Sequence, residues 1–195
     1  MKDNRLTKIV SFLKEIEGFK TIYRRILLDK RRNESDAEHT WHLCMFGLLL
    51  NKELDLNLDL SKVFKLALLH DLPELYAGDT YAFDDEGKKT KAEREEKAAK
   101  ELFGILPEDL GEELYKLFRE YEECKSPEAK FVKAIDKIQP ILSNVCTNGL
   151  TWKENKTTKE TVSNYGVEYI QVDTKLKEMH KNLLKEAEIM DLFYS

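Results

Sequence analysis

Two histidines and two aspartates interrupt segments of this chain that otherwise have the composition of buried helix. They are His39, His70, Asp71 and Asp136. The residues directly before the His-Asp pair, 66–69, are all apolar. Charged groups are costly to bury unless they are paired or bound to a metal. These four side chains are therefore expected to meet one another, or a metal ion, inside the fold.

Two imidazoles and two carboxylates are ligands for a borderline or hard divalent cation. They leave room in an octahedral shell for water and for substrate oxygens, whereas a structural zinc site is usually closed by thiolates. The three cysteines, Cys44, Cys124 and Cys146, lie far apart and include no Cys-x-x-Cys pair. The sequence therefore predicts an open divalent-metal centre and no disulfide framework.

The segments that carry these residues have clear helix boundaries. Ser35, followed three residues later by Glu38, matches a capping box and predicts the start of the helix that carries His39. Pro73 disfavours helical geometry at the residue before it. We therefore expect the pair His70-Asp71 to lie at, or within one turn of, the end of a buried helix.

The whole chain is read as helix after helix, which predicts an all-α bundle of six or seven helices with no convincing strand. Residues 126–127, Ser-Pro, predict the start of the helix that carries Asp136. Helical spacing of apolar residues over 5–19 and 166–192 predicts the first and last helices. The polar segment 151–164 is expected to be a surface loop. Residues 1–195 are expected to form one domain on which the last helix packs.

Composition bounds the function as well as the fold. The chain has 195 residues, 42% of them hydrophobic, which suits one globular domain. Its net charge of −5 argues against a protein that coats a nucleic acid polymer, because such domains carry a basic face. No apolar stretch approaches the length of a membrane helix, and no signal sequence is apparent. The expected location is the cytoplasm.

The ordered set of motifs resembles the HD-domain metal phosphohydrolases, and most closely the HD-domain 5′-deoxynucleotidases. The segments that carry the resemblance are 37–39 (Ala-Glu-His), 69–74 (Leu-His-Asp-Leu-Pro-Glu), 78–79 (Gly-Asp) and 128–136. Together they cover roughly residues 15–145. The resemblance implies an HD-domain helical bundle, a homodimer, and hydrolysis of deoxynucleoside 5′-monophosphates. It also implies one divalent ion, such as cobalt, manganese or magnesium, on the four residues named above.

The resemblance also implies roles for residues around the metal ligands. Glu74 matches a residue associated with water activation, and Asp79 matches an acidic residue near the leaving group and the sugar. We expect Glu74 to be the base and Asp79 the acid, with the reverse order left open. Arg24 matches an arginine that contacts phosphate, and its guanidinium suits phosphate oxygens. Arg25 stands where a bacterial member has an aromatic residue, which leaves the deoxyribose preference open.

Two other functions remain open at this point. The chain could hydrolyse another nucleotide or phosphoester, or it could be a non-catalytic HD module that binds a nucleotide. Leu75 after Glu74 counts against the members that hydrolyse guanosine tetraphosphate, which carry adjacent Glu-Asp. Arg31 and Arg32, the charged run 88–100 and His180 are interpreted as ordinary solvated side chains.

Overall fold

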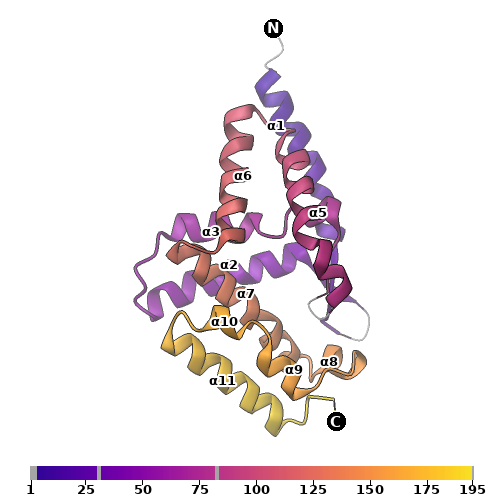
Figure 1. Ribbon diagram of the computed structural model, residues 1–195, viewed down its shortest axis with the longest axis vertical. Coiled ribbons are helices and arrows are strands. Elements are labelled where there is room, and N and C mark those ends of the chain that lie inside the picture. The colour runs from indigo at the N-terminus through magenta and orange to yellow at the C-terminus, as the bar shows by residue number, and fades with distance from the viewer. Residues whose placement is uncertain (1–3, 30–31, 82–83, 195) are drawn as a thin grey trace.

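The computed structural model describes residues 4–29, 32–81 and 84–194, and these are mostly helical (Figure 1). The long helices are α1 (Asn4–Glu15), α2 (Asp36–Glu53), α3 (Leu60–Leu69), α5 (Asp85–Phe103), α6 (Glu108–Glu123), α7 (Pro127–Cys146) and α11 (Thr174–Ile189). The short ones are the 3-10 helix η1 (Ile16–Thr21), α4 (Glu74–Ala77), α8 (Leu150–Glu154), α9 (Lys159–Asn164) and α10 (Val167–Ile170). The predicted all-α class is confirmed, and the long helices within the described ranges number seven.

The expectation of no strand was wrong, because a small antiparallel hairpin precedes α2. Its strands are β1 (Tyr23–Leu27) and β2 (Asn33–Ser35), with Tyr23 opposite Ser35 and Leu27 opposite Asn33. The Asn33 side chain donates to the Arg24 carbonyl at 2.7 Å, and the Leu27 amide donates to Thr151 Oγ1 at 2.8 Å. The two strands are short and mostly polar, so their sequences lack the alternation of apolar and polar residues from which a strand is predicted.

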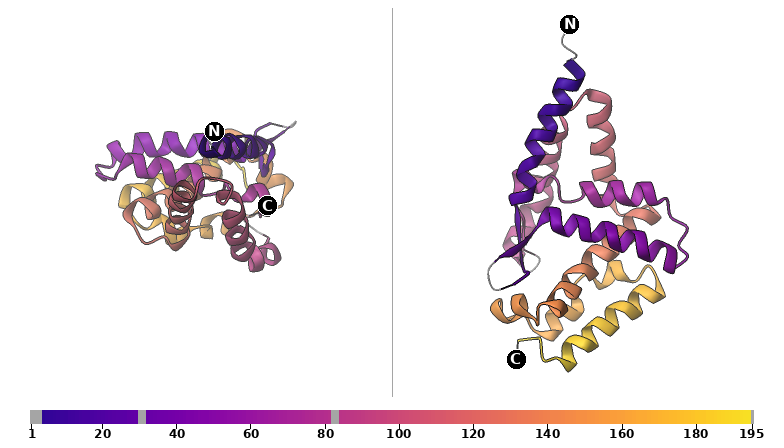
Figure 2. Two further views of the ribbon diagram at one scale, coloured as in Figure 1. Left: turned by 90° about the horizontal axis from the view of Figure 1, so that it is seen from above. Right: turned by 180° about the vertical axis from the view of Figure 1, so that it is seen from behind.

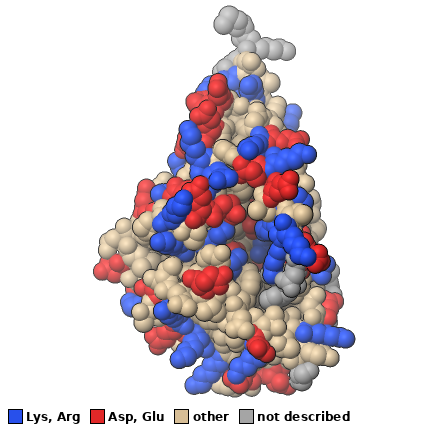
Figure 3. All heavy atoms as spheres, in the orientation of Figure 1, with Lys and Arg blue, Asp and Glu red and all other residues tan. Residues whose placement is uncertain are grey.

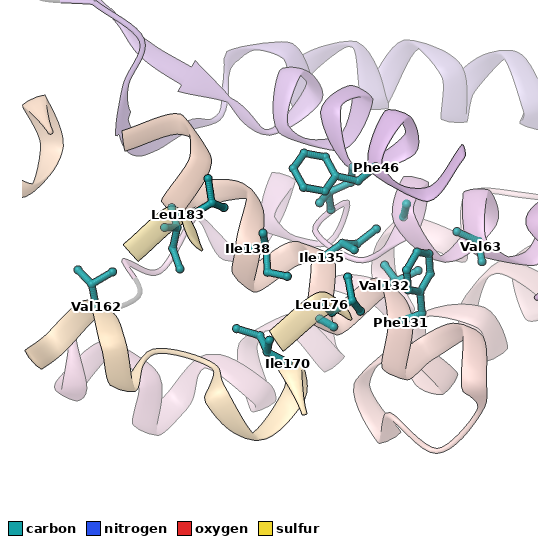
Figure 4. Close-up of a cluster of buried hydrophobic side chains, with 14 of the residues drawn as sticks. Phe46, Val63, Phe131, Val132, Ile135, Ile138, Val162, Ile170, Leu176 and Leu183 are labelled. Atoms are coloured by element: carbon teal, nitrogen blue, oxygen red, sulfur yellow. The ribbon is translucent and has the colours of Figure 1, made fainter. Parts of the chain in front are cut away.

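The main core surrounds α7, which crosses the middle of the molecule between α2 and α3 on one side and α10 and α11 on the other (Figures 1 and 4). Ile135 and Ile138 of α7 are fully buried. A helix that is apolar on most sides must be covered on most sides. This burial fixes where Asp136 can point. None of the described helices is long and apolar enough to cross a membrane.

A second core holds α1, η1, α5 and α6 together at the end of the molecule where the chain begins (Figure 2). The Phe103 ring lies between Phe12 and Phe118, with 6.4 Å between ring centres on each side. These contacts anchor the C-terminal end of α5, whose N-terminal half brings Lys91 to Glu74.

The C-terminal part is more ordered than predicted. Segment 151–164, expected to be a surface loop, contains α8 and α9 and buries Trp152 and Val162. Helices of five and six residues are too short to show helical periodicity, which explains the error. The predicted last helix is two helices, and the side chain of Asp173 caps the second of them by accepting from the Lys175 and Leu176 amides. His180 is buried, contrary to expectation.

Candidate metal centre and active site

The four predicted ligands come from three different parts of the chain and meet in the interior. The predicted capping box is present, with Glu38 N donating to Ser35 Oγ and the Glu38 side chain accepting from Ser35 N. It starts α2 one turn before His39. His70 and Asp71 follow the last turn of α3, and Asp136 lies midway along α7. All four side chains are buried or nearly so.

Ring nitrogens and carboxylate oxygens alternate around this cluster. His39 Nε2 lies 3.0 Å from Asp136 Oδ1 and 3.9 Å from Asp71 Oδ2. His70 Nε2 lies 2.9 Å from Asp71 Oδ2 and 3.8 Å from Asp136 Oδ1. The structure therefore brings these four residues together, with the Nε2 of each histidine within 4 Å of a carboxylate oxygen of both aspartates.

Hydrogen bonds behind the histidines hold their Nδ1 protons away from the cluster. Gln139 donates from Nε2 to Glu34 and Ser143, so its Oε1 must face His39 Nδ1, 3.0 Å away. His70 Nδ1 lies 2.8 Å from the Ala67 carbonyl oxygen. A proton on each Nδ1 leaves the Nε2 lone pair directed at the carboxylates.

This arrangement fits a bound cation. Burial and the nearby Arg24 together lower the pKa of His39 to about 4, so the ring is neutral at pH 7. A neutral Nε2 that carries no proton then faces Asp136 Oδ1 acceptor to acceptor at 3.0 Å. His70 Nε2 is buried with no hydrogen-bond partner. A divalent ion between these atoms satisfies every one of them at once.

Glu74, predicted to act on water, is the first residue of α4 and is 1% exposed. Lys91 of α5 donates to its Oε1 at 3.0 Å, and its Oε2 has no hydrogen-bond partner. Burial and the nearby Asp71 together raise the pKa of Glu74 to about 10, although Lys91 acts in the opposite direction. Such a carboxyl group can carry a proton at neutral pH.

Asp79, the predicted acid, follows Gly78 at the end of α4. It is partly buried and lines the same cavity as Glu74 and Asp71. Burial raises its pKa, and the nearby Arg24 acts in the opposite direction. The charge of Asp79 also raises the pKa of Glu74. Because the two carboxyl groups repel each other when both are ionised, a proton on one favours the ionised form of the other.

Arg24 reaches the cluster from β1. Its Nη1 donates to Asp71 Oδ2 at 2.7 Å and lies 3.7 Å from Asp36 Oδ1, while its Nε lies 3.8 Å from Glu34 Oε2. The next residue, Arg25, points elsewhere and lies over the Tyr81 ring, 5.0 Å from its centre. Arg24 is the cation of the hairpin that adjoins the metal ligands.

Other parts of the basic segment stand apart from the site. Arg32 pairs with Glu38 at an exposed position, 2.7 Å away, as expected of a surface charge. Arg31 lies outside the described residues.

Several residues of the site were not predicted. Lys91 and Glu95 belong to the charged run interpreted as a solvated helix face, yet they pair at 3.1 Å and Glu95 is buried. Gln139 lies three residues after Asp136 on α7, and this helical spacing was a usable signal. Asp36 is fully buried with no hydrogen bond to either carboxylate oxygen, and nothing in its sequence context indicated that.

A cavity of about 670 Å³, within the range of small-molecule sites, adjoins these groups. The charged residues that line it are Arg24, Asp71, Glu74, Asp79, Lys91, Glu95 and Asp136, together with His70. Aromatic residues of the C-terminal part line it as well, among them Trp152, Tyr165 and Tyr169. Figure 3 shows a recess bordered by Lys and Arg side chains. The cavity thus offers both charged groups and aromatic rings to a ligand.

Comparison with known proteins supports the resemblance seen in the motifs. The model of the HD domain family matches residues 16–180. The chain is 36% identical to human 5′-deoxynucleotidase HDDC2 over 135 residues, which are 69% of this chain and 63% of the human protein. It is 35% identical to the zebrafish (Danio rerio) protein of the same name over 142 residues, 72% of this chain and 68% of that one. The matched region thus spans less than two thirds of the human relative.

The structural comparison agrees. The crystal structure of a predicted metal-dependent phosphohydrolase from Magnetospirillum magnetotacticum covers 100% of this chain and 98% of its own, with 36% identity and a TM-score of 0.90. PH0347 of Pyrococcus horikoshii, at 22% identity and a TM-score of 0.65, shares the fold. The buried His/Asp cluster and the family together indicate a site for a divalent metal ion. The chain belongs to the HD domain family.

Proposed function

We propose that this chain is a metal-dependent phosphomonoesterase that releases phosphate from nucleoside 5′-monophosphates, deoxynucleotides included. The observation that carries the proposal is the cluster of His39, His70, Asp71 and Asp136, which adjoins Glu74 and Arg24 at a cavity of about 670 Å³. The 5′-deoxynucleotidase relatives favour the same substrate class. The proposal treats residues 1–195 as one HD domain.

In the proposed site, His39, His70, Asp71 and Asp136 hold one divalent ion, with cobalt, manganese and magnesium as the candidates. When bound, such an ion polarises a phosphoryl oxygen and lowers the pKa of water. The affinity order of divalent metals does not decide which one a mixed nitrogen and oxygen site takes in the cell.

Arg24 binds the phosphate in this proposal. Its guanidinium is held among Asp71, Asp36 and Glu34, so it is aimed at the cluster before any substrate arrives. A phosphate oxygen that replaces the Asp71 oxygen as its partner keeps the charge-assisted hydrogen bond and frees Asp71 for the metal. Pre-orientation of this kind lowers the entropy cost of binding.

Glu74 and Asp79 move the protons. Positive charge beside Asp71 favours the ionised form of Glu74, which then accepts a proton from the attacking water. Asp79, with its raised pKa, gives its proton to the 5′-oxygen as the bond from phosphorus to that oxygen breaks. The products are phosphate and the nucleoside, and the proton that Glu74 took from water returns to Asp79 through solvent before the next turnover.

The expected homodimer and cytoplasmic location are part of the proposal, and no membrane or nucleic acid polymer takes part in it. Exposed apolar side chains on α1 and α2 are available to a second copy, including Leu6, Leu13, Trp41 and Leu49. The molar mass measured by light scattering after size exclusion tests the dimer. A mass near 23 kDa at micromolar concentration would contradict it.

Phosphate release from a panel of ribo- and deoxyribonucleoside 5′-monophosphates tests the function. Metal-stripped protein is supplied with manganese, cobalt or magnesium, and Glu74→Gln is assayed beside the wild type. We expect metal-dependent release that the substitution reduces at least a hundredfold. Release from no monophosphate with any metal would overturn the proposal and redirect the search to other phosphoesters or to nucleotide binding without turnover.

A further inference from the structure

Part of the cavity wall is built by the segment around the junction of α9 and α10, which the proposed chemistry does not use. Tyr165 directly follows α9, Gly166 precedes α10, and Tyr169 lies within α10. The side chains of Tyr165 and Tyr169 line the cavity and are only partly buried. Figure 1 shows α10 alongside α7, the helix that carries Asp136, and the two helices are in contact. A residue pair of this kind faces whatever part of the substrate lies beyond its phosphate.

Lys137 fixes the distance between this wall and the metal ligands. Its Nζ donates to Asp136 Oδ2 at 2.8 Å and lies 5.4 Å from the centre of the Tyr165 ring. These two contacts in series keep the ring within one nucleoside length of the Asp136 carboxylate. A phosphate at the cluster therefore brings the base of a 5′-mononucleotide to the level of Tyr165.

Close packing holds the wall in place. Gly166 has a φ of +65°, and a Cβ there would lie 2.7 Å from Lys137 Cβ. The backbone of the segment thus rests on the stem of Lys137, with no space for a side chain between them. The two tyrosines are presented by a fixed backbone, which is what a recognition surface requires.

Two other aromatic rings of the cavity already have a partner. Trp152 stacks on Phe193 with ring centres 5.0 Å apart, and Arg25 lies over Tyr81. Tyr169 lines the cavity and is only partly buried, so part of its side chain can be reached by a ligand.

We propose that Tyr165 and Tyr169 form the subsite for the nucleobase, with the base stacked against this wall while the phosphate lies at the metal ligands. The inference rests on the proposed function, and it assigns base recognition to the C-terminal segment. Stacking needs a π-face and tolerates every base, so the subsite favours nucleotides over sugar phosphates. A purine presents more surface than a pyrimidine and gains more from the contact.

The test compares a nucleotide with the same phosphoester that lacks a base. The substrates are dAMP, dCMP and 2-deoxyribose 5-phosphate, and the variants are Tyr165→Ala and Tyr169→Ala. Tyr165→Phe and Tyr169→Phe keep the ring, and Tyr194→Ala removes a tyrosine that does not line the cavity. We expect each alanine variant to raise KM for dAMP about tenfold, and KM for dCMP less. The kcat/KM for 2-deoxyribose 5-phosphate, and both parameters in the phenylalanine and Tyr194 variants, should stay within twofold of wild type.

An equal loss with dAMP and with 2-deoxyribose 5-phosphate would overturn the inference, because it would mean that Tyr165 acts only by holding Lys137 against Asp136. The binding arm needs no turnover. Calorimetry should show that wild-type protein binds dAMP about tenfold tighter than 2-deoxyribose 5-phosphate, and that the alanine variants lose the difference. Equal binding of the two by the wild type would also overturn the inference. Absence of phosphate release together with this binding difference would instead overturn the proposed function alone.

Discussion

Replacing Asp36 with asparagine is expected to stabilise the metal-free protein at neutral pH and to leave its stability unchanged near pH 4. Asp36 is fully buried, and among the described residues neither of its carboxylate oxygens has a hydrogen-bond partner. Burial and the nearby Asp71 together raise the pKa of Asp36 to about 8, and Arg24 at 3.7 Å only partly opposes them. An asparagine has the same shape and no charge to lose.

The direction of the pH effect follows from the two states of the chain. In the unfolded chain an aspartate loses its proton near pH 4, whereas folded Asp36 keeps it to about pH 8. Between these values the folded protein binds more protons, so stability falls as pH rises. Each pH unit between these two pKa values lowers the free energy of unfolding by about 1.4 kcal/mol. The destabilisation caused by Asp36 at pH 7 is therefore at most about 4 kcal/mol. We expect Asp36→Asn to recover about 2 to 4 kcal/mol there.

Urea denaturation followed by circular dichroism, in EDTA at pH 4, 5, 6, 7 and 8, measures this difference. Asp109→Asn is the matched control, because Asp109 is exposed and paired with Arg5, and its substitution should change stability by less than about 0.5 kcal/mol across this range. Parallel curves of stability against pH for wild type and Asp36→Asn would refute the reasoning. So would a variant that is less stable than wild type at pH 7.

Three further substitutions have defined outcomes. Gly166→Ala should lower the free energy of unfolding by about 2 to 4 kcal/mol, because it adds a left-handed backbone cost and a steric overlap; a loss under 0.5 kcal/mol in urea denaturation would contradict this. Gln139→Leu should weaken Mn²⁺ binding about 10- to 100-fold in equilibrium dialysis, since it releases His39 Nδ1; unchanged affinity would contradict it. Lys91→Met removes the cation that lowers the pKa of Glu74. The kcat at pH 7 should therefore fall about tenfold, and the pH profile of kcat should move to higher pH. An unshifted profile would show that Lys91 does not set the pKa of the catalytic base.

The meeting of these histidines and aspartates could be predicted because burying such groups costs free energy unless they are paired or bind a metal. Asp136 lies within the apolar helix α7, and His70 and Asp71 directly follow the apolar helix α3. Only pairing within a cluster or binding to a metal offsets the cost of burying such residues. The helix boundaries were equally readable, since Ser35 and Pro73 act through local backbone chemistry. The position of each ligand along its helix then left few ways for them to meet.

The groups that surround the ligands could not be predicted in the same way. Lys91 and Glu95 look like solvated charges in a run of charges, and only the packing of α5 against α4 turns them inward. Hairpin pairing and the short helices α8 to α10 depend on long-range contacts, such as Leu27 with Thr151. The local sequence of such a segment does not indicate which residue more than a hundred positions away will be its hydrogen-bond partner.

The central claim is that the rate of phosphate release depends on metal bound at the His/Asp cluster. A metal titration tests this claim most directly. Metal-stripped wild type and Asp136→Asn are titrated with Mn²⁺, and bound metal and phosphate release from dAMP are measured on the same samples. We predict that release by the wild type rises in proportion to bound metal up to one equivalent, and that Asp136→Asn binds at least tenfold more weakly. Phosphate release at full rate without bound metal, or tight binding and full activity in Asp136→Asn, would contradict the account.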